Sequence, residues 1–101
     1  MKQCLDHIAL KVSNIQKSID WYLANYEDAI EIYSDKTWGM IEIGDLKIAL
    51  VINDTHPPHI AIRQYTKVPE NIKKHRDGSY YIYEKDPDCN VIERIWWPEY
   101  E

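Results

Sequence analysis

Three residues of this 101-residue chain have the types and spacing that could bind a divalent metal: His7, His59 and Glu93. Each lies in a stretch where apolar and polar residues alternate, a pattern that predicts a strand. The alternation places each of the three opposite its apolar neighbours. If both halves of the chain turn their helices outward, the three side chains project into one shared concave cleft. Two neutral imidazoles and a carboxylate suit a divalent transition metal, with positions left open for water or substrate.

The surroundings of the two histidines are repeated along the chain. Residues 59–63, His-Ile-Ala-Ile-Arg, match residues 7–11, His-Ile-Ala-Leu-Lys, at an offset of 52 (59 minus 7). Aligning the last strand of each half pairs Ala49 with Glu93, an offset of 44 (93 minus 49). The sequence therefore predicts two copies of one supersecondary unit. The second copy is about eight residues shorter (52 minus 44), so we expect it to lack a strand or much of its helix.

The elements that must position these residues follow from local signals. Ser13 has the form of a helix N-cap, with Gln16 three residues later reaching back to it. The dipeptide Gly44-Asp45 suits a two-residue turn between antiparallel strands. Pro69 suits the first turn of a short helix. The expected strands cover residues 5–12, 29–33, 37–43, 46–52, 79–84 and 91–97, and the expected helices run from Ile15 to about Tyr26 and from Pro69 to about His75.

Composition narrows the classes of function. A formal net charge of -5 and an isoelectric point near 5.3 argue against a nucleic-acid surface, which needs clustered Lys and Arg. The short basic run 73–76 is interpreted as a solvated helix end, which places His75 on the surface, and His56 is expected in a solvated loop. No stretch approaches the roughly 18 apolar residues of a membrane span. Two distant cysteines suggest no disulfide framework, and a cytoplasmic location is expected.

Beyond these patterns, the sequence resembles the vicinal oxygen chelate superfamily, which includes glyoxalase I, extradiol dioxygenases, methylmalonyl-CoA epimerases, fosfomycin-modifying thiol transferases and bleomycin-binding proteins. Residues 5–12 running into 18–22 are similar to the opening of its first module. Residues 58–62 are similar to the start of its second module, and residues 81–93 to its closing strands.

The resemblance implies an α+β fold of two βαβββ modules, the second abbreviated, that form a curved mixed sheet around a metal or ligand cleft. A single domain over residues 1–101 is expected, with module one at about 1–53 and module two at about 58–97. Metal ligands in this superfamily come from the first and last strands. The ligands that the resemblance implies here are His7, His59 and Glu93.

Two departures from the family pattern bear on function. A fourth ligand of glyoxalase I-like members falls on Ala49, which cannot bind a metal, so the three-ligand set resembles the dioxygenases and fosfomycin-type transferases more closely. Cys89 stands where the usual Asp-Pro-Asp-Gly turn has glycine. If Cys89 is left-handed, it costs about 1 kcal/mol relative to glycine.

Further site residues are expected on the faces that adjoin the ligands. Ser79, Tyr81 and Tyr83 share one face of their strand, and Trp38 and Met40 share one face of the hairpin. Substrate contact by these residues is predicted, with Tyr81 and Glu93 in catalytic roles. The alternative is that tyrosines simply pack well in strands, and that Trp38 and Met40 fill the interior.

The leading hypothesis is a metal-dependent enzyme in which the metal chelates two oxygens of a small substrate, as a lyase, isomerase, transferase or dioxygenase. The metal is Fe, Mn, Ni, Co or Zn. The alternative is a protein without catalytic activity that sequesters a drug or metabolite, as bleomycin-resistance proteins do. In either case the expected partner is a small molecule, neither a nucleic acid nor a membrane. The resemblance also implies a homodimer.

Overall fold

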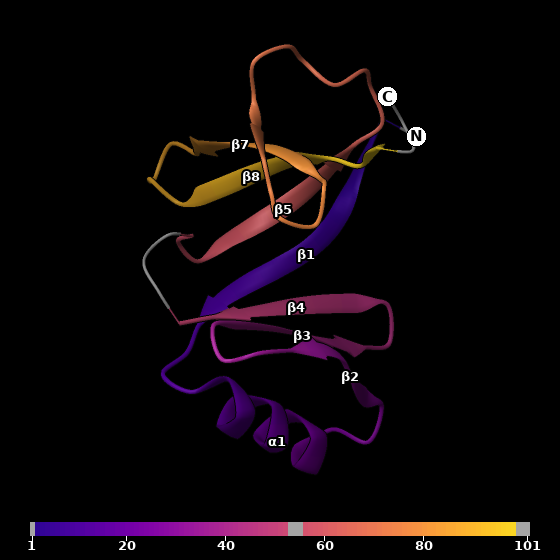
Figure 1. Ribbon diagram of the computed structural model, residues 1–101, viewed down its shortest axis with the longest axis vertical. Helices are drawn as coiled ribbons and strands as arrows, with labels where there is room; N and C mark the ends of the chain where they lie inside the picture. Colours follow the sequence, from indigo (N-terminus) through magenta and orange to yellow (C-terminus); the bar gives the residue numbers. More distant parts are fainter. Residues whose placement is uncertain (1, 53–55, 99–101) are drawn as a thin grey trace. The chain divides into compact units, whose positions relative to one another are not determined.

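The computed structural model describes residues 2–52 and 56–98 (Figure 1). These residues fall into two compact units: residues 7–58 form the N-terminal unit, and residues 1–6 join residues 59–101 in the C-terminal unit. The elements are β1 (Gln3–Lys11), α1 (Ile15–Asn25), β2 (Ala29–Ser34), β3 (Trp38–Ile43), β4 (Leu46–Val51), β5 (His59–Gln64), β6 (Lys73–Lys74), β7 (Tyr80–Lys85) and β8 (Val91–Trp96). The boundary between the units falls inside β1, after Asp6.

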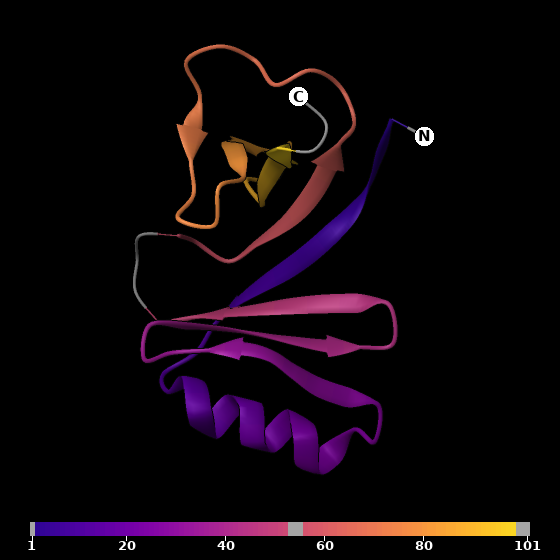
Figure 2. The same ribbon diagram turned by 45° about the vertical axis from the view of Figure 1, so that its right-hand side comes forward.

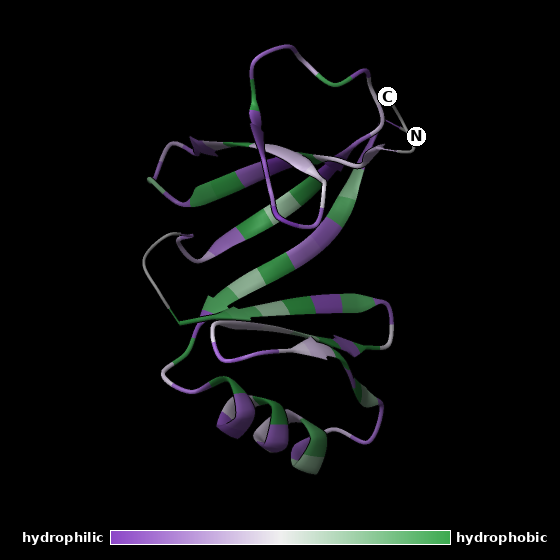
Figure 3. Cartoon of the chain, in the orientation of Figure 1, coloured by the Kyte–Doolittle hydropathy of each residue, from purple (hydrophilic) through white to green (hydrophobic). Residues whose placement is uncertain are grey.

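The N-terminal unit is a four-stranded sheet with one helix against it. Its strand order is β2-β3-β4-β1, with β1 parallel to β4 and the other pairs antiparallel. Helix α1 contacts β2, β3 and β4, and bands of polar and apolar residues alternate around it (Figure 3). The predicted hairpin register is confirmed, since Ile43 pairs with Leu46 across the Gly44-Asp45 turn. Apolar residues of α1 and of the β3–β4 hairpin form the core, which comprises Ile15, Ile19, Ile41, Ile48 and Leu50.

The start of α1 differs from the sequence prediction by one residue. Asn14, not Ser13, is the N-cap: its backbone is extended, and its Oδ1 accepts a hydrogen bond of 2.9 Å from the Lys17 amide. Asn caps a helix at least as well as Ser, so the neighbouring residue takes the role. Gln16 donates to Asp20 instead of reaching back to the cap.

The C-terminal unit repeats this sheet without the helix. Its strand order is β1-β5-β8-β7-β6, and of β1 only the residues up to Asp6 belong to this unit. Strand β5 is parallel to β8, as β1 is to β4, and β8-β7-β6 are antiparallel neighbours. The abbreviation predicted for the second copy is confirmed: its described residues contain no α-helix, and β6 has only two residues.

The prediction of a short helix from Pro69 to about His75 is wrong. This segment belongs to the long excursion between β5 and β7 that carries β6 (Figure 2). Asn71 has φ of 62°, which is incompatible with a right-handed helix, and Lys73 and Lys74 pair with Tyr81 and Tyr80 in β6. Helix nucleation has an unfavourable free energy, and a segment this short has no apolar face whose burial would offset it.

Strand register confirms the repeat that the sequence suggests. In the N-terminal unit Ala9 pairs with Ala49, and in the C-terminal unit Ala61 pairs with Glu93. The first members differ by 52 (61 minus 9) and the second by 44 (93 minus 49), the two offsets obtained by alignment. Ala49 therefore occupies the position in its unit that Glu93 occupies in the other.

Losing the helix leaves one face of the C-terminal sheet open to solvent. Ile60 and Ile82 are exposed there, and Arg94 donates to the Glu84 carboxylate at 2.9 Å on the same face. Chain alternation puts Glu93 on the opposite face, where it is buried. The candidate site therefore lies on the face of this sheet that buries Glu93.

The turn between β7 and β8 yields the first prediction. Cys89 adopts φ of 67°, the left-handed conformation that favours glycine, while Asp86 closes the turn by accepting bonds from the Asp88 and Asn90 amides. Cys89→Gly is expected to raise the free energy of unfolding by about 1 kcal/mol, because it relieves backbone strain. Thermal and denaturant unfolding measure the gain.

Cys89→Ala is the matched control, since it removes the thiol but keeps a Cβ. It should bring no comparable gain. Equal stability of the glycine and alanine variants would contradict the explanation by backbone strain.

Candidate metal centre

The candidate site is built around the carboxylate of Glu93, which is 1% exposed. Its Oε2 lies 2.6 Å from Nε2 of His75, and its Oε1 lies 3.3 Å from Nε2 of His59. Burying a carboxylate without compensation is costly, and the hydrogen bond between His75 and Oε2 offsets part of that cost. Strand β8 supplies Glu93, strand β5 supplies His59, and His75 follows β6.

The separation of His59 and Glu93 suits a shared metal ion. Ligand atoms about 2.0–2.2 Å from one ion stand roughly 3–4 Å apart from each other. The 3.3 Å between His59 Nε2 and Glu93 Oε1 falls in this range. His59 is also held by aromatic contact, since its ring centre lies 5.2 Å from that of Tyr83.

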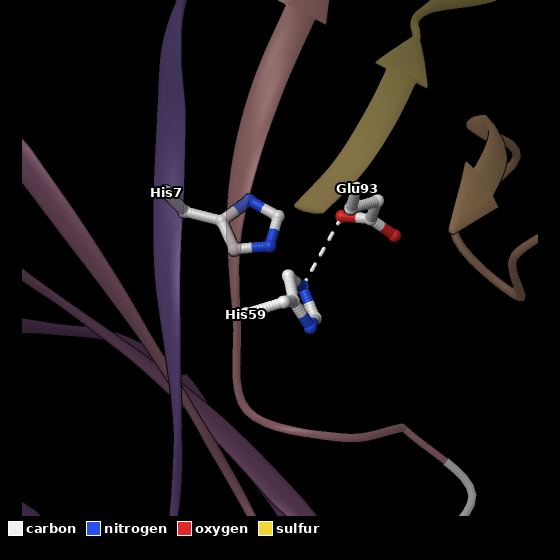
Figure 4. A group of neighbouring side chains, drawn as sticks. All are labelled: His7, His59 and Glu93. Carbon is white, nitrogen blue, oxygen red and sulfur yellow. Dashed lines mark ion pairs between the residues drawn. The ribbon is translucent and has the colours of Figure 1, made fainter. Parts of the chain in front are cut away.

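The third residue of the candidate set, His7, projects from β1 (Figure 4). His7 belongs to the N-terminal unit, whereas His59 and Glu93 belong to the C-terminal unit. The preceding residue, Asp6, is fixed to the C-terminal unit because its Oδ2 accepts a 2.9 Å hydrogen bond from Trp97 Nε1. Two imidazoles and one carboxylate are a donor set that fits a divalent transition metal.

His75 is the residue that sequence reasoning missed. The sequence predicts His75 on the surface at a solvated helix end, yet its side chain is only 18% exposed and it contacts the buried carboxylate. Its ring also stacks on that of Tyr81, with centres 3.6 Å apart and planes 7° from parallel. The Asp77-Gly78 dipeptide is a hairpin signal that could have replaced the helix with a turn and brought His75 beside the site strand.

The predicted common face of Tyr81, Tyr83 and Glu93 is confirmed. Tyr83 pairs with Glu93 across β7 and β8, and the two tyrosine rings meet edge to face at 5.2 Å. Burial raises the pKa of both phenols, and the Glu93 charge raises each further. Both tyrosines therefore stay protonated at neutral pH and can act as hydrogen-bond donors.

The other predicted site residues have local roles in the structure. The fully buried Ser79 donates its hydroxyl to Asp77 at 2.6 Å, within the turn before β7. Trp38 and Met40 lie on β3 of the N-terminal unit, where Trp38 packs on Tyr33. Their contact with a substrate stays a prediction. His56, expected in a solvated loop, is half-buried.

Comparisons of the sequence and the structure with known proteins show which proteins this chain is similar to. No family model matches the sequence. Metallothiol transferase FosB of Staphylococcus saprophyticus is 30% identical over 93 residues, which are 92% of this chain and 61% of that protein. The structure of a methylmalonyl-CoA epimerase aligns over 100% of this chain and 99% of its own, with a TM-score of 0.74 and 13% identity. The chain thus shares the fold of this epimerase and is similar to the transferase over most of its own length.

A second solved structure shares the fold. A hypothetical protein from Staphylococcus aureus shares the fold with a TM-score of 0.61 over 93% of this chain and 33% of its own, at 8% identity. The chain spans about three-fifths of the transferase that it matches. Within the part of the chain that the structure describes, no helix is long and apolar enough to cross a membrane.

The electrostatics of the site yield the second prediction. Glu93→Gln should lower the pKa of Tyr81 and Tyr83, because it removes a nearby negative charge. The values should stay above the ordinary 10.0, since burial is the larger cause and remains. Alkaline titration of tyrosinate absorbance, with Tyr81→Phe and Tyr83→Phe to assign the transitions, measures the shift.

The sign of the linked stability follows. Because the folded phenols hold their protons more tightly than the unfolded chain does, the folded state loses stability as pH rises above 10.0. Glu84→Gln is the control, since Glu84 faces Arg94 on the other side of the sheet. Equal tyrosine shifts in the two variants would argue against a specific effect of Glu93.

Proposed function

We propose that this protein binds one divalent transition metal through His7, His59 and Glu93 and uses it on a small, oxygen-bearing substrate. The observation that carries the proposal is the buried Glu93 carboxylate, with an imidazole nitrogen 3.3 Å from the oxygen that would face the metal. The same three residues are the ones that the superfamily resemblance implies. His7 and His59 would bind as neutral imidazoles and Glu93 as a carboxylate.

The bound metal would act as a Lewis acid on substrate oxygens. The chain itself contributes the surroundings. Tyr83 packs against His59 and limits the orientations of that ring. Tyr81, whose raised pKa keeps it protonated, would donate a hydrogen bond to a substrate oxygen that gains negative charge. Ala49 fills the place of a fourth ligand with a methyl group, so the protein supplies three ligands.

Among the reaction classes that the resemblance leaves open, transfer of a thiol to the substrate has the most support. A three-ligand set resembles the fosfomycin-type transferases, and the relative that is 30% identical is named a metallothiol transferase. Isomerisation of the glyoxalase type would need a carboxylate base beside the metal, and Glu93 is already assigned as a ligand. Methylmalonyl-CoA epimerase shares the fold at 13% identity, so its reaction is not carried over.

Metal loading is the third prediction. Untagged protein, freed of metal and then challenged with Mn(II), Fe(II), Co(II), Ni(II) and Zn(II), should retain about one equivalent of a preferred ion by elemental analysis. His59→Ala and Glu93→Gln should each abolish tight binding, because each removes one of three ligands. His56→Ala is the matched histidine control and should load as wild type does. Circular dichroism checks that each variant is folded.

Folded wild-type protein that binds none of these ions tightly would overturn the proposal. The chain would then be better explained as a sequestering protein, which needs no metal. Its acid net charge of -5 and its aromatic residues would suit a planar cationic ligand. In that case a calorimetric titration with such a ligand, for example bleomycin, should give the same affinity for wild type and His59→Ala.

A further inference from the structure

The hairpin between β6 and β7 fixes His75 in place through its backbone. The His75 amide donates to the Ser79 carbonyl at 2.8 Å, and the Gly78 amide donates to the His75 carbonyl at 3.0 Å. Asp77 tightens the same turn by accepting bonds from both the amide and the hydroxyl of Ser79. Gly78, with φ of 94°, supplies the backbone conformation that the turn requires. His75 is thus held on a closed turn, unlike a residue of an open loop.

The imidazole of His75 is fixed as well. It lies flat on the Tyr81 ring, with 3.6 Å between ring centres. Tyr81 meets Tyr83 at 5.2 Å, and Tyr83 meets His59 at 5.2 Å. These four rings form a continuous series that begins and ends on the Glu93 carboxylate, which His75 and His59 both contact. We call this series the aromatic clamp: His75, Tyr81, Tyr83 and His59.

The clamp distinguishes the two oxygens of Glu93. Oε2 lies 2.6 Å from His75 Nε2, the separation of a hydrogen bond. A carboxylate that is ionised, as a metal ligand is, accepts this bond from the ring N–H. Oε1 is the oxygen that lies nearest His59. A carboxylate held in this way has one oxygen directed to the proposed metal and the other engaged by the protein.

We propose that His75 is a positioning residue: it holds Oε2 of Glu93 and so makes Glu93 bind the metal through Oε1 alone. The proposal rests on the proposed function for the metal itself, but His75 is no ligand and touches no substrate in it. Partners that orient a metal ligand from outside are typically worth 10–100-fold in metal affinity. In the N-terminal unit, where Ala49 replaces Glu93, nothing needs such a partner.

Two substitutions separate the hydrogen bond from the packing, and they give the fourth prediction. His75→Phe keeps a ring that can stack on Tyr81 but removes the donor. His75→Gln keeps an N–H donor at a similar reach but removes the ring. If His75 positions Glu93, His75→Phe should weaken Co(II) binding by roughly 10–100-fold and change the visible spectrum of the Co(II) protein, as Glu93 becomes free to bind through both oxygens. His75→Gln should restore most of the affinity and the spectrum.

A purely structural His75 gives a different pattern. His75→Phe would then bind Co(II) as tightly as wild type with the same spectrum, or both variants would lose affinity in step with lost thermal stability. Either result overturns the proposal. If His75→Phe does not fold, Tyr81→Leu removes the stacking partner and leaves the donor in place; it should broaden or shift the Co(II) spectrum with a smaller loss of affinity, and an unchanged spectrum would count against the clamp.

A measurement on metal-free protein separates this inference from the proposed function. Long-range ¹⁵N–¹H NMR of the histidine rings should show the His75 proton on Nε2, with a hydrogen-bonded shift that is lost in Glu93→Gln. If wild type binds no Co(II) but this signal is present, the metal function fails while the contact stands. A proton on Nδ1 alone would overturn the role of His75 whatever the metal result.

Discussion

The buried carboxylate of Glu93 is the constraint on which the C-terminal unit is organised. A carboxylate that is 1% exposed is costly to bury without partners. The chain brings one imidazole nitrogen to 2.6 Å from Oε2 and another to 3.3 Å from Oε1, from elements far apart in sequence. His59 comes at the first residue of β5, and His75 comes from the turn that opens β7. The parallel pairing of β5 with β8 brings His59 to Glu93, and the β6–β7 hairpin brings His75 to the other oxygen.

The two units show how one supersecondary plan serves two purposes. In the N-terminal unit the sheet is covered by α1, and an alanine stands at the position equivalent to Glu93. In the C-terminal unit the helix is absent and the excursion between β5 and β7 carries a two-residue strand and His75. The shortening of the second copy therefore did more than remove a helix, because the remaining segment presents an imidazole to the proposed metal ligand.

Much of the fold could be predicted because its signals are local. The turn residues Gly44 and Asp45 set the hairpin register, and apolar alternation assigned the core face that α1 covers. The repeat of His7 at His59 gave offsets that the strand registers reproduce, and the non-glycine residue at 89 is left-handed as its place in the turn implied. The N-cap shifted by one residue because Ser13 and Asn14 are both good caps and only local geometry chooses between them.

What could not be predicted depends on pairing across the chain. His75 lies 18 residues from Glu93, and its place depends on Lys73 and Lys74 forming β6 against β7. A proline and a run of basic residues favoured a helix instead, and that assignment turned the imidazole outward. The residues around His75 do not indicate that its partner Glu93 lies in β8. Tertiary pairing therefore overrode the local prediction of a helix.

The most direct test of a metal centre built on Glu93 is anomalous diffraction from crystals grown with Co(II). The account predicts one anomalous peak within bonding distance of His7, His59 and a single oxygen of Glu93, with the other oxygen against His75. A peak on other residues, or none at this place in crystals of protein that retains Co(II), would contradict it.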